Sequence, residues 1–185
     1  MDVREAIERR RAYRSLDPVP VTDEMLSEVI ESVRLAPSCF NQQPWRYVFV
    51  RDPAVLEEIF TALGRGNEWA TAASMVVAVF SEKDEDCVIR DREYYLFDTG
   101  MATAFMILRF TELGLIAHPI AGFSQTRVKE ILSIPEGAKL ITLLIVGKRS
   151  PDLSPLLSEK QIENERARPE RITPGEFTFH DRYDG

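Results

Sequence analysis

Four arginines near the start of the chain are the first group of residues that could do chemistry. They lie at the end of a short predicted helix and are Arg9, Arg10, Arg11 and Arg14. Guanidinium groups bind phosphate in bidentate fashion, so the cluster could form an anion site. Cations are also favoured at the C-terminus of a helix, and the same arginines could form an ordinary solvated basic end. Charge alone leaves both interpretations open.

A loop rich in amide side chains is the second candidate. Residues 36–45 read APSCFNQQPW, and Ser38, Asn41, Gln42 and Gln43 stand between two prolines. Single amides are common in loops, so it is the high density of amides in this segment that indicates a possible binding site. Paired amide donors and acceptors can bind a planar heterocycle or a polyol. The loop therefore could hold a ring-bearing ligand.

A glycine at the end of an apolar run is the third candidate. The segment HPIAGF covers residues 118–123, and such a glycine usually marks only a turn. Glycine also permits close approach of the backbone to a ligand. The free N–H of Ala121 or Gly122 could then donate to a ring nitrogen.

The common catalytic motifs are missing from the sequence. Gly64 and Gly66 do not complete a dinucleotide fingerprint, and there is no phosphate-binding P-loop and no nucleophile elbow. Cys39 has no neighbouring residue that supports it as a nucleophile. Cys39, Cys87 and the two histidines lack metal-ligand spacing, so no metal site is predicted. Chemistry would therefore depend on an organic cofactor.

Prolines and capping residues delimit the elements that must position these groups. Thr22 begins a helix that stops before Pro37, and Pro53 opens the next one. The predicted helices cover residues 2–11, 22–36, 53–63 and 91–113, with another starting near Ser124. The predicted strands cover residues 47–50, 74–81, 115–123 and 140–147.

The helix predicted over residues 91–113 is apolar on nearly every face. A helix of this kind must be buried, and a chain of 185 residues can hardly cover all its sides. A partner subunit could cover one face, which predicts a homodimer. After Lys148 the chain is polar and proline-rich, so we expect a tail there and no second domain.

Composition sets the remaining expectations. The length and a hydrophobic content of 44% suit a single domain over residues 1–185. A formal net charge of -7 argues against nucleic acid as a partner. The two cysteines fit a reducing cytosol, and no secretion signal or membrane-spanning run is present. We expect a soluble, cytoplasmic protein without a membrane partner.

Taken in this order, these segments resemble the FMN-dependent nitroreductase family. The resemblance spans nearly the whole chain and rests on IERRRAYRSL, APSCFNQQPWRYVFV, DTGMATAFMILRFTELGL, PIAGF, LLIVGKR and ERARPERITPGEF. It implies an α+β fold with a central antiparallel sheet flanked by helices. It also implies a homodimer in which residues 149–185 form a domain-swapped C-terminal arm, with each FMN bound by both chains.

The resemblance assigns a set of cofactor-binding residues. For the phosphate and ribityl chain it implies Arg10, Arg11, Ala12, Arg166 and Arg168, with Arg171 as a competing choice. For the flavin ring it implies Arg14 and Asn67 at the pyrimidine edge, and the segment of Pro119, Ile120, Ala121 and Gly122 near N5. From the partner subunit it implies Pro37, Ser38, Cys39, Asn41 and Gln43. Ala12 departs from the family, where serine is frequent, and the missing hydrogen bond costs about 1 kcal/mol.

The resemblance also implies a reaction. Hydride would pass from NAD(P)H to flavin N5 and on to a small acceptor such as a nitroaromatic or a quinone, in a ping-pong cycle without a catalytic side chain. Three alternatives stay open: a noncatalytic FMN-binding sensor or store, a specialised flavin reductase of an unidentified metabolite, and an acidic dimeric scaffold without a cofactor.

Overall fold

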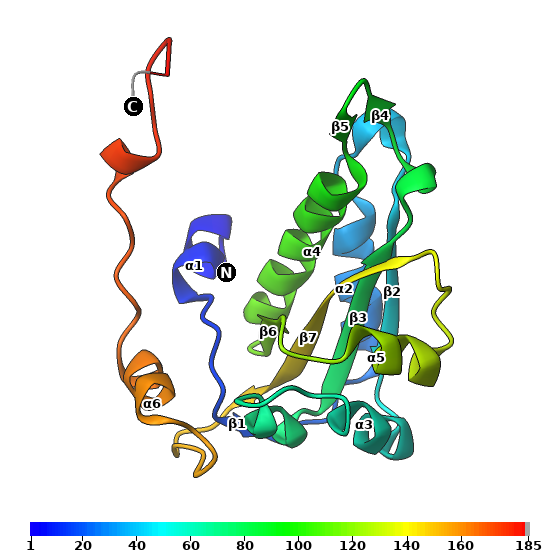
Figure 1. The fold of residues 1–185 in the computed structure, drawn as a ribbon. Helices are drawn as coiled ribbons and strands as arrows, with labels where there is room; N and C mark the ends of the chain where they lie inside the picture. Colours follow the sequence, from blue (N-terminus) through cyan, green and yellow to red (C-terminus); the bar gives the residue numbers. More distant parts are fainter. Residues whose placement is uncertain (184–185) are drawn as a thin grey trace.

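Five antiparallel strands form the centre of the computed structural model, which describes residues 1–183 (Figure 1). The strands are β1 (Leu16–Asp17), β2 (Trp45–Val50), β3 (Met75–Ser81), β6 (Ile116–Ile120) and β7 (Lys139–Arg149). The long strand β7 pairs with β3 along one edge and with β6 along the other, and its last two residues pair with β1. Strand β2 pairs with the free edge of β3. The sheet is antiparallel, as predicted.

Helices cover both faces of the sheet. On one face, α2 (Asp23–Arg34) and α4 (Tyr95–Glu112) pack on Met75, Val77 and Val79 of β3. On the other, α3 (Pro53–Phe60) and α5 (Gln125–Leu132) pack on Val76 and Ala78. Successive side chains of a strand point to opposite faces, which explains why the apolar run of β3 is buried on both sides. The predicted α+β class with a flanked central sheet is confirmed.

Local signals set most helix starts at the predicted positions. The Thr22 hydroxyl accepts from the N–H of Met25, and the Ser124 hydroxyl accepts from that of Arg127. Pro53 occupies the first turn of α3, after the capping carboxylate of Asp52. Side-chain caps satisfy N–H groups that have no partner inside the helix. The first helix, α1 (Val3–Arg9), packs on α4.

Two elements differ from the sequence predictions. Helix α4 begins at Tyr95 and not at residue 91, because β4 (Val88–Ile89) and β5 (Arg92–Glu93) form a small hairpin before it. The tail contains a helix that was not predicted, α6 (Glu159–Arg166). Short 3-10 turns complete the described elements: Cys39–Asn41, Glu68–Ala72, Lys83–Glu85 and Pro174–Glu176.

Helix α4 is buried on one side only within a single chain. Ala102, Met106 and Phe110 are inaccessible, whereas Phe97 and Phe105 are 63% and 40% exposed. A single chain therefore covers only one face of this apolar helix, as expected from its length, and whether a partner covers the other face stays a prediction. The apolar outer face of α4 is left uncovered.

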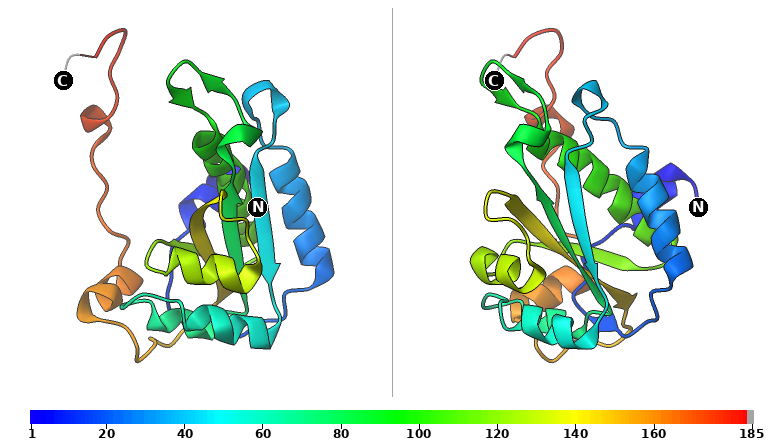
Figure 2. Two further views of the ribbon diagram at one scale, coloured as in Figure 1. Left: turned by 45° about the vertical axis from the view of Figure 1, so that its right-hand side comes forward. Right: turned by 90° about the vertical axis from the view of Figure 1, so that its right-hand side faces the viewer.

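The C-terminal residues leave the body of the protein after α6. Residues 167–183 run away from the sheet as an extended segment, shown from orange to red in Figures 1 and 2, and they are exposed throughout. Residues 150–166, by contrast, stay on their own chain, where Ser150 donates to the Ser15 carbonyl. The aromatic end forms no strand in its described part. No helix within residues 1–183 is long and apolar enough to cross a membrane.

Candidate functional site

An arginine-lined pocket of about 130 Å³ lies between the segment that follows α1 and the end of α6. We call it the arginine pocket, and its walls are Arg10, Arg11, Ala12, Arg14, Asn164, Arg168, Pro169 and Arg171. It brings together five of the predicted phosphate and ring residues, and the competing choice Arg171. Arg166 is not part of its lining and is exposed on α6.

Helix α6 fixes the backbone of the pocket. The carboxylate of Glu165, which is 5% exposed, accepts from the N–H of Arg14 at 2.6 Å and from that of Ser15 at 3.4 Å. The guanidinium of Arg11 donates to the carbonyl of Asn164 at 2.6 Å. Charge-assisted hydrogen bonds of this kind are strong, so residues 10–15 are held in one conformation. Arg11 is thus already engaged by the protein.

The pocket has an unbalanced positive charge. Burial, followed by the charges of Arg168, Arg171 and Arg11, lowers the pKa of Arg10. Within residues 1–183, no ion pair is formed by Arg10, Arg14, Arg168 or Arg171. Arg168 donates instead to the carbonyls of Glu8 and Arg10, at 2.6 and 3.0 Å. Glu165 is a carboxylate whose charge acts on Arg14. Arginines outnumber it in the lining, and converging guanidinium groups favour an anion such as phosphate.

Asn67 and Gly122 meet beside this pocket, although they are 55 residues apart in the chain. The amide Nδ2 of Asn67 donates to the carbonyl of Gly122 at 2.9 Å, and the N–H of Gly64 donates to the same oxygen at 2.7 Å. A Cβ at position 122 would lie 2.5 Å from that amide nitrogen, so any other residue there would have to displace the Asn67 side chain. Two residues predicted for the flavin ring are thus in direct contact.

The turn after β6 presents unused backbone donors. Ala121 and Gly122 are exposed, and within the described residues their N–H groups donate no hydrogen bond. Ile120 is buried in the core, and its carbonyl accepts from the Thr142 hydroxyl at 2.8 Å. Pro119 is exposed on the same strand. The strand end is therefore rigid, while two amides remain available to a ligand.

Trp69 and His118 connect the arginine pocket with this turn. The guanidinium of Arg14 lies 5.9 Å from the Trp69 ring centre, and the His118 ring lies 4.7 Å from that of Trp69. His118 donates through Nδ1 to the carbonyl of Tyr13 at 3.1 Å. Burial is the main cause that lowers the pKa of His118 to about 4, helped by the charges of Arg14 and Arg10. The histidine is therefore neutral near pH 7.

Sequence reasoning missed four of these supporting residues: Trp69, His118, Asn164 and Glu165. Burial of His118 could have been predicted from its position in the strand, since its neighbours Ala117 and Ile120 are core residues. Glu165 had no such signal, because an acidic residue in a polar helix usually faces solvent.

The amide loop lies at the other end of the sheet. The loop leads into Trp45, which pairs with Ser81, and Ser81 in turn pairs with Lys139 at the start of β7. The arginine segment leads into Leu16, which pairs with Arg149 at the opposite end of β7. Pro37, Ser38, Cys39, Asn41 and Gln43 are therefore not brought to the arginine pocket of their own chain. Asn41 and Gln43 have φ values of 59° and 53°, and the Ser38 hydroxyl accepts from the Gln43 N–H at 3.0 Å.

Cys39 is joined to Cys87 by a disulfide, with the two Cα atoms 6.0 Å apart. The sequence analysis did not predict this bond, because the two residues are 48 positions apart. Disulfides are rare in the reducing cytosol that we expected from the cysteine content. Cytoplasmic localisation stays a prediction.

Fold and site together define an α+β protein with an arginine-lined pocket and a glycine turn whose backbone donors are free within residues 1–183. The family model described as the nitroreductase family matches residues 7–74 and 61–148. The chain belongs to the nitroreductase family. The family predicted from the sequence is confirmed, and with it the oxidoreductase class.

Individual relatives agree with this assignment. A Thermus thermophilus protein named NADH dehydrogenase is 26% identical over 178 residues, which cover 80% of this chain and 86% of the relative. A solved structure described as an oxidoreductase containing FMN has a TM-score of 0.81 at 27% identity, covering 100% of this chain and 94% of the other. An Exiguobacterium sibiricum structure in complex with FMN has a TM-score of 0.71 at 22% identity, covering 88% and 96%.

Proposed function

We propose that the protein is an FMN-dependent oxidoreductase that transfers hydride from NAD(P)H to a small acceptor by a ping-pong mechanism. One observation carries the proposal: a pocket lined by several arginines, of which Arg10, Arg14, Arg168 and Arg171 form no ion pair within the described residues, stands beside a turn with two unused backbone donors. Such a site suits a ligand with a phosphate at one end and a ring with hydrogen-bond acceptors at the other. FMN has this form, and it is named for two of the similar structures.

The residues present fit FMN, and each has a distinct task. Arg10 and Arg168, with Arg171, would hold the phosphate, while Arg14 and Asn67 would face the pyrimidine edge. The N–H groups of Ala121 and Gly122 would point to N5. When bound, FMN would accept hydride from NAD(P)H at N5 and deliver electrons to an acceptor such as a nitroaromatic or a quinone.

The charges around the site support reduction of such a ring. Arg14 is a cation that would stabilise negative charge building up at the pyrimidine edge. His118 is neutral near pH 7 and adds no competing charge. No protein acid or base is needed in this proposal, so the protein binds and orients the reactants and supplies the electrostatic environment.

We further propose that the working unit is a homodimer. The exposed apolar face of α4 and the extended segment after α6 have no cover within the described chain. Pro37, Ser38, Cys39, Asn41 and Gln43 lie at the far end of their own sheet from the arginine pocket. In a dimer they would reach the pocket of the partner, and the arm would wrap around it. A cytoplasmic location is part of the same proposal.

A visible absorbance spectrum of the purified protein tests the cofactor. We expect the visible absorbance of a bound flavin, and mass spectrometry should identify the released compound as FMN. Oxidation of NADH or NADPH should then depend on an added quinone or nitroaromatic. Colourless protein that takes up no FMN would contradict the proposal, and bound FMN without turnover would favour a sensor or store.

A further inference from the structure

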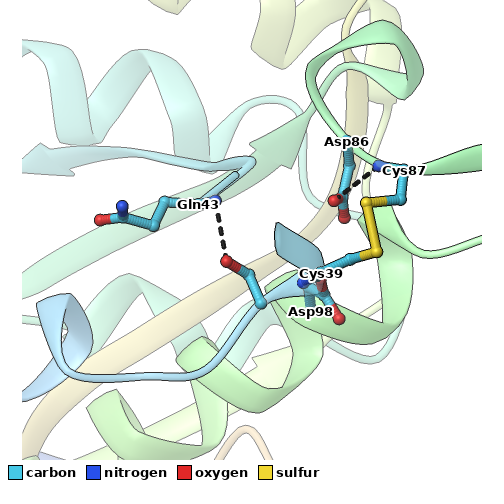
Figure 3. The surroundings of a disulfide bond; sticks show 6 residues. Cys39, Gln43, Asp86, Cys87 and Asp98 are labelled. Carbon is cyan, nitrogen blue, oxygen red and sulfur yellow. Dashed lines mark hydrogen bonds between the residues drawn. A yellow bond between two sulfur atoms is a disulfide. The ribbon is translucent and has the colours of Figure 1, made fainter. Parts of the chain in front are cut away.

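The disulfide between Cys39 and Cys87 lies within a cluster of acidic side chains (Figure 3). A carboxylate oxygen of Asp86 and the two sulfur atoms all lie within 4.8 Å of one another. Asp98, which is 1% exposed, accepts from the N–H of Cys39 at 2.6 Å. Asp86 accepts from the N–H of Cys87 at 2.7 Å. Each cysteine backbone is thus held by a carboxylate, independently of the bond between the sulfurs.

The disulfide connects the amide loop, which is anchored to helix α4, with the exposed β4–β5 hairpin. Cys39 belongs to the amide loop, which Asp98 anchors to the buried side of α4. Cys87 begins the hairpin β4–β5, whose strands have two residues each and are exposed. An exposed ion pair between Arg46 and Glu85 also joins the hairpin region to β2, and Asp86 contacts Asp98 of α4. Exposed ion pairs contribute little, so the disulfide is the strong link between the hairpin region and the amide loop.

Both cysteines are half-buried, and the segments that carry them are at the surface. Cys39 is followed by Phe40, which is 83% exposed, and Cys87 is followed by exposed Val88. A small thiol can approach a disulfide in this position, unlike one inside a core. Thiol–disulfide exchange depends on such access.

We propose that Cys39 and Cys87 form a reversible thiol–disulfide exchange site for small-molecule thiols, and that its oxidation state decides whether the β4–β5 hairpin is fastened to the amide loop. The exchange does not depend on the proposed function. Only its effect on the partner's cofactor would, because the amide loop is the segment expected to reach that cofactor.

The exchange is balanced with a thiol, RSH, as the reductant. The thiolate RS⁻ attacks one cysteine sulfur, forms a mixed disulfide and displaces the other sulfur, which takes up a proton. A second RS⁻ attacks the sulfur of the bound R group, and the cysteine leaves and is protonated. The products are RSSR and two cysteine thiols, so two electrons pass from the small thiols to the protein.

Asp86 lies close to both sulfur atoms. Burial is the main cause that raises the pKa of Asp86, and the nearby Asp98 adds to it, whereas the hydrogen bond from the Cys87 N–H lowers it. A carboxylate oxygen of Asp86 within 4.8 Å of the two sulfurs adds negative charge beside the disulfide, so an incoming thiolate approaches from the side away from Asp86.

The test counts thiols at different ratios of reduced to oxidised glutathione. The chain contains only these two cysteines, so alkylation followed by mass spectrometry reports on this pair alone. We expect two labelled cysteines in reduced glutathione, none in the oxidised form, and the same curve from both directions. A pair that stays oxidised in a large excess of reduced glutathione, or that never forms the bond, would overturn the proposal. So would reduced thiols that retain zinc and resist oxidation.

Limited digestion with trypsin tests the fastening of the hairpin. Arg90 and Arg92 lie in the exposed hairpin, and reduction should speed cleavage there severalfold. Cleavage after Arg171 in the exposed segment should not change, which provides an internal control. The Cys39→Ser/Cys87→Ser variant should be cleaved rapidly under both conditions, and Cys39→Ala/Cys87→Ala checks that serine itself has no effect. Equal cleavage rates at Arg90 and Arg92 in the oxidised and the reduced protein would refute the proposal that the disulfide holds the hairpin to the amide loop.

Thiol counting and proteolysis require no flavin, so they can succeed or fail independently of the proposed function. FMN retention is then measured for both oxidation states. If the oxidised and the reduced protein retain FMN equally well, the disulfide has no effect on the cofactor, but the thiol–disulfide exchange itself is unaffected by that result.

Discussion

Arg14 and Arg168 both line the arginine pocket, but their surroundings differ. The guanidinium of Arg14 lies 5.9 Å from the ring centre of Trp69, which follows Asn67 by two positions in the chain. Arg168 holds the carbonyls at the end of α1 and stands at the start of the extended segment. The first position suits a cation beside the ring, and the second suits one beside the phosphate.

Replacing these arginines should therefore have different effects. Arg14→Ala should lower the flavin potential and slow reduction by about 10-fold or more, because a cation that stabilises developing negative charge is lost. Arg168→Ala should mainly weaken FMN retention, by about 10-fold or more, since charge-assisted hydrogen bonds are lost. Stopped-flow reduction and equilibrium dialysis measure the two effects. Arg14→Lys should restore part of the reduction rate, and equal effects of both alanine variants on retention alone would contradict the division.

His118 should make stability depend on pH. Burial lowers its pKa from 6.5 to about 4, so the unfolded chain binds a proton more readily than the folded protein. Its contribution is complete above pH 6.5 and is lost as the pH falls towards about 4. The loss should amount to about 3 kcal/mol at most. Urea unfolding from pH 7 to pH 4 measures it, and His118→Gln should flatten the dependence. An unchanged slope in that variant would assign the effect to other groups.

Much of the site was predictable at the level of residue types. Arg10, Arg14, Asn67 and Gly122 were named from the family resemblance; the structure places the two arginines in one pocket and Asn67 against Gly122. The carboxylate and ring that support them were not predictable, because Glu165 and Trp69 act through contacts between distant segments. Local sequence patterns do not encode such contacts.

At the scale of elements, the segments with a clear apolar face were predicted correctly, and the polar or exposed segments were missed. The helices with an apolar face and a cap were found close to their true bounds. Helix α6 was missed because Glu165 is its only buried residue. The capping box of Ser158 and Gln161 was the signal that could have found it. The β4–β5 hairpin was missed because its strands are short and exposed.

The disulfide should contribute to stability by restraining the unfolded chain. It links residues 48 positions apart, and its loss should lower the free energy of unfolding by about 2–4 kcal/mol. Chemical denaturation of the oxidised protein and of the Cys39→Ser/Cys87→Ser variant measures this difference. Added reductant should destabilise the wild-type chain and leave the variant unchanged. A variant as stable as the oxidised protein would mean that the bond does not restrain the unfolded state.

At the scale of the whole molecule, the exposed segment after α6 is the feature on which the proposed homodimer depends. Ile172, Phe177 and Tyr183 are 62%, 56% and 76% exposed, and the ring of Tyr183 contacts that of Phe179 in the same segment, with 4.5 Å between ring centres. Exposed apolar side chains in such a row are typical of an interaction surface.

Removal of residues 172–185 should therefore weaken the proposed homodimer. The shortened chain keeps Arg168 and Arg171, so the arginine pocket itself is preserved. Light scattering coupled to size exclusion should show dimers for the full chain and a larger fraction of monomers for the shortened one at micromolar concentration. Circular dichroism checks that the body remains folded. A full chain that is a stable folded monomer at that concentration would contradict the homodimer.

Arg168 has two structural roles. It lines the arginine pocket, and it lies at the start of the extended segment that follows α6. A displacement of that segment would be transmitted directly to the pocket. If the segment is fixed by a partner and the pocket by FMN, each binding event stabilises the other by the same free energy. Dilution of the protein should then release cofactor, and added FMN should drive association. Cofactor occupancy would rise with protein concentration, so the amount of enzyme in a cell would set the active fraction as well as the total.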